Sequence, residues 1–172
     1  MITVLRLGHR LGRDARISTH CGLAARALGA NKIIYSGDKD ESLIESVKDV
    51  AERWGGSFKV EYEKNWKEVT EKYKKRKYAI IHLTVYGLPV QNEVRKLRKN
   101  KNMLIIIGGE KVPPEVYDLS DCNISVTNQP HSEVASLAIL LHEYHKGKEL
   151  EKRFGKARIR VVPQKKGKKV IG

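Results

Sequence analysis

Two short polar loops follow apolar runs in the second half of the chain and carry residue types suited to ligand binding. The run Met103 to Ile107 leads into Gly108 to Pro113, and the weaker run Cys122 to Val126 leads into Asn128 to Glu133. Loops at the carboxyl ends of parallel strands expose backbone donors and helix N-termini, while the sheet holds them in place. Paired glycines allow a ligand to approach the backbone closely. The two loops therefore predict a ligand-binding site.

Arginine is concentrated at the N-terminus. The first 31 residues contain five arginines and no lysine, although lysine is the commoner cation in the rest of the chain. Arginine offers planar, multi-donor recognition of phosphate or carboxylate, so this bias indicates an oxyanion-binding loop. Asp14 is the only acid among the first 37 residues, which makes simple surface ion pairing a weaker explanation. His9 and His20 lie near these arginines and add groups for acid–base chemistry.

The chain as a whole is strongly basic. Its 34 Lys and Arg residues outnumber 20 Asp and Glu, which gives a net charge of +14 with neutral histidines. A field of this sign favours polyanionic partners. Residues 146–172 hold eleven of the cations and only two acids. Ala157 to Val162 alternates as a strand does, and Lys169 to Ile171 can return against it, so we predict a basic β-hairpin. The alternative is a solubilising tail.

Several familiar catalytic motifs are missing from the sequence. There is no GxxxxGK(S/T) phosphate loop and no GxGxxG after the first strand, which argues against nucleotide hydrolysis and dinucleotide redox chemistry. GxSxG and HExxH are absent as well. His142 and His145 lie three residues apart near the end of a predicted helix, where we expect them to face solvent rather than a metal. No metal site is predicted.

Two periodicities of apolar residues alternate along the chain. Strands are expected at 2–7, 32–35, 58–62, 78–83, 103–107 and 122–127, and helices at 18–28, 41–54, 66–75, 90–100, 114–118 and 130–145. Strands that alternate with helices predict an α/β fold, a parallel sheet with helices on both faces. Pro113 and Pro130 suit the first turns of the helices that follow them.

Cysteine usage and hydropathy bear on location. Cys21 and Cys122 lack CxxC spacing and no signal peptide is recognised, which together predict the reducing cytoplasm. No apolar run approaches the roughly 20 residues of a membrane-spanning helix, so no membrane partner is expected.

The predicted helix Pro130 to His145 is apolar on more than one side. Residues such as Val134, Leu137 and Leu141 form one stripe, while Ile139 lies outside it. A helix of this kind is buried on more than one side. It is either a core helix or one that packs on its own sheet and on a second subunit, and periodicity does not choose between these.

Taken together, these blocks resemble the archaeal family of tRNA cytidine-56 2'-O-methyltransferases, within the SPOUT class of S-adenosylmethionine-dependent RNA methyltransferases. The blocks that carry the resemblance are, in chain order, Leu5 to Arg10, Arg13 to Arg16, Thr19 and His20 with Leu23, Ala25 to Ala27, Gly29 and Ala30, Gly108 to Pro113, and Asn128 to Ala135. The resemblance covers residues 1–145. We therefore expect a catalytic domain over 1–148 and a basic C-terminal extension over 149–172.

The resemblance implies a fold, a cofactor and partners. It implies a trefoil-knotted SPOUT sheet, S-adenosyl-L-methionine as methyl donor, tRNA as substrate, and a homodimer packed through the helix 130–145. It also implies donor-binding positions in three loops, namely Leu83, Gly108, Gly109, Glu110, Lys111, Val112, Val126, Thr127, Asn128, Gln129, Pro130, His131, Ser132 and Glu133.

Catalytic positions follow from the same resemblance. Arg16 is the first candidate beside the reacting ribose, with Arg10, Arg13 and His20 near the flanking phosphates. Arginine is a poor base, so either a neighbouring phosphate takes the 2'-hydroxyl proton or His20 or His131 does. The sequence leaves this choice open.

Two other functions remain compatible with the sequence. One is a SPOUT methyltransferase that acts on a nucleobase of tRNA or rRNA, although the arginine-rich first loop suits ribose and phosphate better than a base. The other is a non-catalytic RNA-binding protein that uses the net charge of +14 and the basic hairpin.

Overall fold

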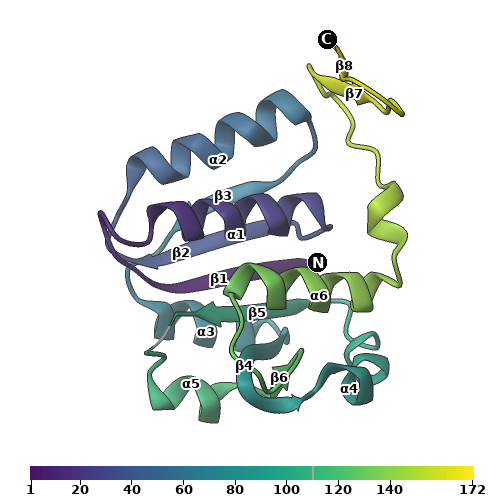
Figure 1. The fold of residues 1–172 in the computed structure, drawn as a ribbon. Helices are drawn as coiled ribbons and strands as arrows, with labels where there is room; N and C mark the ends of the chain where they lie inside the picture. The colour runs from purple at the N-terminus through teal and green to yellow at the C-terminus, as the bar shows by residue number, and fades with distance from the viewer. Residues whose placement is uncertain (110) are drawn as a thin grey trace.

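The fold is built on one six-stranded parallel sheet (Figure 1). The structure, a computed structural model, describes residues 1–109 and 111–172. The strand order is β3-β2-β1-β5-β4-β6, and every pair is parallel. The strands are β1 (Ile2–His9), β2 (Lys32–Gly37), β3 (Lys59–Tyr62), β4 (Ala79–Pro89), β5 (Met103–Gly108) and β6 (Cys122–Ser125). The α/β prediction is confirmed.

Helices cover both faces of this sheet, as predicted. They are α1 (Ala15–Ala27), α2 (Glu41–Trp54), α3 (Trp66–Lys75), α4 (Val90–Leu97), α5 (Pro114–Leu119) and α6 (Glu133–His145). Buried side chains of α1, α2, α4 and α6 share one core with the sheet, and those of α3 and α5 share the other. Short connections between successive strands and helices favour this layered arrangement.

The central strand β1 contributes apolar side chains to both cores. On β1, Ile2 and Val4 enter the first core, whereas Leu5 and Leu7 enter the second. Successive side chains of a strand point to opposite faces, so a strand buried on both sides must be apolar throughout. Arg6 breaks this run on the face shared with α1 and α6, and its side chain is only 2% exposed.

Strand β4 is longer than predicted. We expected a strand that ends at Leu83 and a loop up to Gly87, but β4 runs to Pro89 with a register shift in between. Ile124 of β6 pairs with Leu83 and again with Leu88. The intervening residues thus bulge around β6, a long-range contact that local periodicity does not reveal.

Two helix starts also differ from the predictions. Helix α1 begins at Ala15 rather than Ser18, because the Asp14 carbonyl already accepts the Ser18 amide at 2.9 Å. Helix α6 begins at Glu133 rather than Pro130, because Ser132 takes the N-cap and its side chain accepts from the Ala135 amide at 3.2 Å. Helix α4 and strand β6 end two or three residues earlier than expected.

The basic C-terminal hairpin is present as predicted. Helix α6 is followed by a short 3-10 helix, η1 (Lys148–Glu151), within which the expected domain boundary falls. Strands β7 (Arg160–Val162) and β8 (Lys169–Ile171) then pair antiparallel. Figure 1 shows this hairpin at the periphery, away from the main sheet. Within the described residues, no helix is long and apolar enough to cross a bilayer.

Candidate active site

Two adjoining cavities open where the strands of the sheet end. The first has a volume of about 620 Å³ and the second about 440 Å³. Residues of β1 and the arginine-rich loop line the first cavity, together with Gly37, Asp38 and Lys111. Residues of β4, the glycine loop and the start of α6 line the second. Gly109 and Glu133 line both cavities, so the two meet at these residues.

The arginine-rich loop is held by Asp14. One carboxylate oxygen accepts from the Arg10 amide at 3.2 Å and from the Arg10 Nε at 3.0 Å. Burial alone would raise the pKa of Asp14, but the hydrogen bond and charge of Arg10, with the charge of Arg6, hold that pKa below its ordinary value. Asp14 thus stays ionised and fixes the loop, and Arg10 and Arg13 line the first cavity.

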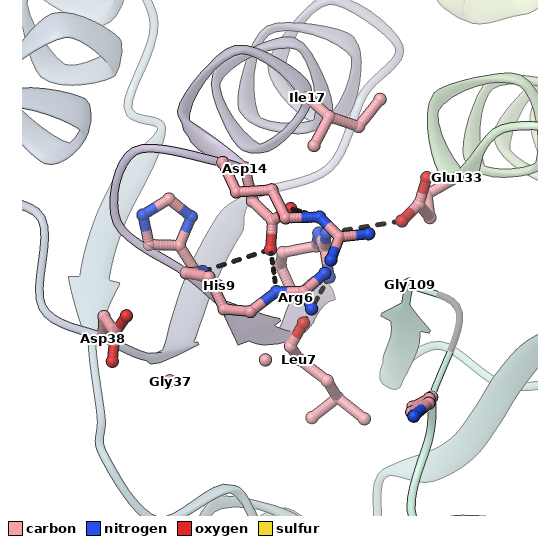
Figure 2. Close-up of a pocket in the computed structure, with 13 residues that line it drawn as sticks. Arg6, Leu7, His9, Asp14, Ile17, Gly37, Asp38, Gly109 and Glu133 are labelled. Atoms are coloured by element: carbon pink, nitrogen blue, oxygen red, sulfur yellow. Dashed lines mark hydrogen bonds and ion pairs between the residues drawn. The ribbon is translucent and has the colours of Figure 1, made fainter.

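His9 ties this loop to two helices and is 1% exposed. Its Nδ1 lies 2.9 Å from the Ser18 hydroxyl of α1, and its Nε2 lies 3.3 Å from Oδ2 of Asp40, the N-cap of α2. His9 lines the first cavity, and Figure 2 shows its ring to one side of Asp14. Ser18 is fully buried, so this Ser–His–Asp arrangement holds structure rather than presenting a nucleophile.

Arg6 and Glu133 form an ion pair at the junction of the cavities. Nη2 of Arg6 lies 3.3 Å from Oε1 of Glu133, and the Glu133 side chain is 20% exposed. The other terminal nitrogen, Nη1, donates to the Leu7 carbonyl. Figure 2 shows the Glu133 carboxylate pointing from α6 toward this guanidinium.

A buried network lies beneath the second cavity. The Asn123 amide nitrogen donates to the Tyr117 carbonyl at 3.1 Å, which leaves its oxygen to accept from Nδ1 of His82 at 2.9 Å. Tyr117 also stacks edge-on against His82, with ring centroids 4.7 Å apart. Burial lowers the pKa of His82, although the hydrogen bond with Asn123 opposes this, so the ring is neutral. The network joins β4, α5 and β6 under one site.

Seven of the predicted donor-binding residues line the second cavity: Leu83, Gly108, Gly109, Val112, Pro130, His131 and Glu133. Lys111 lines the first cavity instead. Five others line neither: Val126, Thr127, Asn128, Gln129 and Ser132. Among these, Asn128 donates to the Val85 carbonyl, so it ties two of the loops together rather than facing the cavity. Glu110 lies outside the described residues.

The four predicted catalytic residues do not all reach the cavities. Arg10 and Arg13 line the first one, whereas Arg16 and His20 do not. Both of the latter are exposed, one turn apart on α1. Arg16 directly precedes Ile17, which lines the first cavity.

Sequence reasoning missed several residues of the second cavity, namely His82, Ile107, Tyr117 and Ser136. His82 carried a signal, because a histidine inside an otherwise apolar strand must satisfy its polar atoms in the core. Tyr117 carried none, since only the packing of α5 against β4 brings it there. Within the described part of the chain, no group of three His, Cys, Asp or Glu residues is arranged to hold a metal.

Solved structures of similar fold include RNA methyltransferases. The chain matches an RNA 2'-O ribose methyltransferase with a TM-score of 0.63 and 15% identity, over 86% of this chain and 56% of that one. It matches the SpoU methyltransferase AviRb from Streptomyces viridochromogenes, solved in complex with AdoMet, with a TM-score of 0.63 and 16% identity, over 86% and 57%. The chain thus spans just over half of these two proteins.

A third match is the TrmH/SpoU tRNA modifying enzyme of A. aeolicus, with a TM-score of 0.62 and 16% identity, over 87% of this chain and 76% of that one. At such identities the likeness concerns the fold alone. The fold is that of the SPOUT methyltransferases, as predicted.

Sequence comparison defines the family within this class. A family model described as tRNA ribose 2'-O-methyltransferase, aTrm56, matches residues 54–171. Proteins named tRNA (cytidine(56)-2'-O)-methyltransferase are 53% identical in Methanopyrus kandleri, over 97% of this chain and 94% of that protein, and 50% identical in Pyrococcus horikoshii, over 99% and 85%. The chain belongs to this tRNA ribose 2'-O-methyltransferase family, which confirms the resemblance.

Proposed function

We propose that this protein is an S-adenosylmethionine-dependent methyltransferase that methylates the ribose 2'-hydroxyl of cytidine 56 in the T-loop of tRNA. Family membership supports the reaction and the nucleotide. One structural observation carries the assignment to a site: an arginine-lined cavity meets a glycine-rich one at Gly109 and Glu133. The first suits a polyanion and the second a ligand that carries a neutral adenine ring.

The second cavity fits the methyl donor. Its volume of about 440 Å³ lies within the range of about 300–1,000 Å³ typical of small-molecule sites. Leu83 and Val112 supply apolar surface, and Gly108 and Gly109 expose backbone groups. When bound, the donor supplies an electrophilic methyl group that needs no metal for transfer.

The first cavity and its rim bind the RNA strand. Arg10 and Arg13 line this cavity and would grip phosphates, and Arg16, exposed on the neighbouring helix α1, is the residue that we assign to the reacting ribose. His20 lies one turn further along α1, where it suits a flanking phosphate rather than the ribose.

Arg16 can be tested directly. Replacing Arg16 with Ala is expected to lower turnover strongly and to leave the affinity for S-adenosylmethionine nearly unchanged, because the residue lies outside the donor cavity. Single-turnover assays and calorimetry measure the two quantities. The reverse pattern would remove Arg16 from the catalytic role.

The reaction itself is tested by locating the new methyl group. A tRNA transcript incubated with protein and donor should gain a 2'-O-methyl group at cytidine 56, detected by mass spectrometry of nuclease fragments. Transfer to a base would favour the nucleobase methyltransferase. A purely RNA-binding protein would show neither transfer nor the donor-dependent rise in melting temperature expected of a ligand that binds the folded state.

The homodimer implied by the family resemblance is also part of the proposal. The inner face of α6 is buried by its own sheet, α1 and α4, but Ile139 on the outer face is 44% exposed. Packing of this face on a second copy would cover that side chain. Replacing Ile139 with Arg should shift the molar mass measured by light scattering from dimer to monomer, whereas a wild-type monomer would contradict the proposal.

The trefoil knot implied by the family resemblance is a further part of the proposal. The double pairing of Ile124 with Leu83 and Leu88 supports a chain that passes through the β4 loop, and a crystal structure would test this by its chain trace.

An enzyme that acts on tRNA works in the cytoplasm, which agrees with two free cysteines. The hairpin adds phosphate contacts through its lysines.

A further inference from the structure

We propose that Glu133 is the base that removes the proton from the ribose 2'-hydroxyl, and that buried Arg6 positions it. This inference rests on the proposed function, because it requires the methyl donor in the second cavity and RNA in the first. It selects a residue that the sequence placed only among the donor-binding positions.

The location of Glu133 is the first reason. Methyl transfer must occur where the donor cavity meets the RNA cavity, and Glu133 and Gly109 are the residues that line both. A Cβ atom on Gly109 would lie 3.4 Å from Oε1 of Glu133 and 3.8 Å from Nη2 of Arg6. Gly109 has no side chain, so the carboxylate remains open to both cavities.

The burial of Arg6 and its pairing with Glu133 are the second reason. Its side chain is 2% exposed, and within the described residues its Nε has no hydrogen-bond partner. Burying a charge is costly unless it is paired, so the contact with Oε1 of Glu133 fixes both groups. This contact occupies Oε1 and leaves Oε2 as the oxygen that can accept a proton.

Several charged and titratable groups share the cavities with Glu133. They are Arg6 and His9 on β1, Arg10, Arg13 and Asp14 in the loop before α1, Asp38 after β2, His82 on β4, Lys111 after β5, and His131 before α6. Buried Cys21 of α1 lies close enough for the Glu133 charge to raise its pKa, although burial is the larger cause. Cations thus outnumber acids around Glu133.

Competing bases are less well placed. His131 lines only the donor cavity, and its Nδ1 lies 3.2 Å from the Ser132 carbonyl. His20 is exposed on α1 and lines neither cavity. Among the described residues, Glu133 is the proton acceptor that lines both cavities.

The step balances without any further reactant. The 2'-oxygen forms a bond to the methyl carbon as the carbon–sulfur bond breaks, and the electron pair of that bond passes to sulfur. The 2'-hydroxyl proton passes to Oε2 of Glu133 and then to water. The products are the 2'-methyl ether and a neutral thioether, and the carboxylate is regenerated.

The test is Glu133→Gln, which keeps the size and the contact with Arg6 but cannot take a proton. We expect kcat to fall about 10²–10⁴-fold, the usual contribution of a general base. Calorimetric affinity for the donor and filter-binding affinity for tRNA should change less than about threefold. The rate deficit should shrink at higher pH, because solvent base replaces the carboxylate, and Glu133→Asp should recover part of kcat.

Two outcomes would overturn the assignment. A kcat within threefold of wild type, with the same pH profile, would show that the proton goes elsewhere. Loss of donor affinity together with kcat would make Glu133 a donor-binding residue instead. Glu45→Gln, on the exposed face of α2, is the matched control and should behave as wild type. If wild-type protein methylates no tRNA, the proposed function fails, which is a distinct result.

Discussion

Gly87 lies directly against the backbone of Ile124. A Cβ atom on Gly87 would come within 2.5 Å of the Ile124 nitrogen, a separation that real Cβ atoms do not adopt. The β4 segment therefore closes on β6 only because this position lacks a side chain. Since neighbouring residues of β4 line the donor cavity, the contact connects chain packing to cofactor binding.

We expect Gly87→Ala to destabilise the protein by about 1–3 kcal/mol, the usual cost of overpacking. The obstacle is backbone, which cannot swing aside as a side chain can. Urea denaturation measures the change, and donor affinity should fall as well because the loop shifts. Gly155→Ala, where a Cβ would meet nothing within 4 Å, is the control and should be nearly neutral.

The glycine loop offers a test by paired substitution. A Cβ on Gly108 would lie 2.5 Å from Cγ2 of Val112, so Gly108→Ala should weaken donor binding. Val112→Ala removes that atom, and the double variant should bind better than additivity predicts, with a coupling of about 0.5–3 kcal/mol. Calorimetric titration of the wild type, the two single variants and the double variant measures this coupling. Strict additivity would mean that the loop relaxes without Val112.

Acid sensitivity should depend on His82. Burial lowers its pKa in the folded state below the unfolded reference of about 6.5, so the unfolded chain binds more protons as pH falls. Stability is therefore complete above about pH 6.5 and is lost on acidification, by at most about 1.4 kcal/mol per pH unit for one proton. Urea denaturation at pH 7.5 and 5 should show a smaller loss for His82→Gln than for wild type. His20→Gln, on the exposed face of α1, should retain the wild-type loss.

The C-terminal extension should be held less tightly when the Phe154 side chain is truncated. The Arg26 guanidinium lies 4.4 Å from the centre of the Phe154 ring, and Arg26 also donates to the Gly55 carbonyl at 2.6 Å. Phe154→Ala should speed amide exchange at Arg158 and Ile159, which both donate to the Arg53 carbonyl, by about two- to thirtyfold. Unchanged exchange would mean that backbone bonds alone hold the extension.

The lysines of the hairpin should contribute to tRNA affinity. Replacing Lys165, Lys166 and Lys168 with Gln should weaken binding and reduce the slope of log affinity against log salt by about 0.7–0.9 for each phosphate that is no longer neutralised. The matched control replaces Lys96, Lys99 and Lys101, three lysines that precede β5 and lie outside the hairpin. Equal slopes in the two variants would make the hairpin a structural element.

Local sequence patterns determined the layers of this protein. Alternation of apolar residues along strands and helical spacing between them predicted all six strands of the sheet and the basic hairpin, because both periodicities are properties of neighbouring residues. The strand-end loops with Gly108 and His131 likewise predicted a cavity at this edge, since carboxyl ends of parallel strands share one edge.

Only the tertiary structure decided how those parts meet. No local pattern indicates that Arg6 on β1 forms an ion pair with Glu133 at the start of α6. No local pattern indicates that Leu83 and Leu88 of β4 both pair with Ile124. Both relationships depend on strand order and on burial across long separations, which the sequence does not display. That order brings the buried charge of Arg6 and its partner Glu133 to the wall between two cavities.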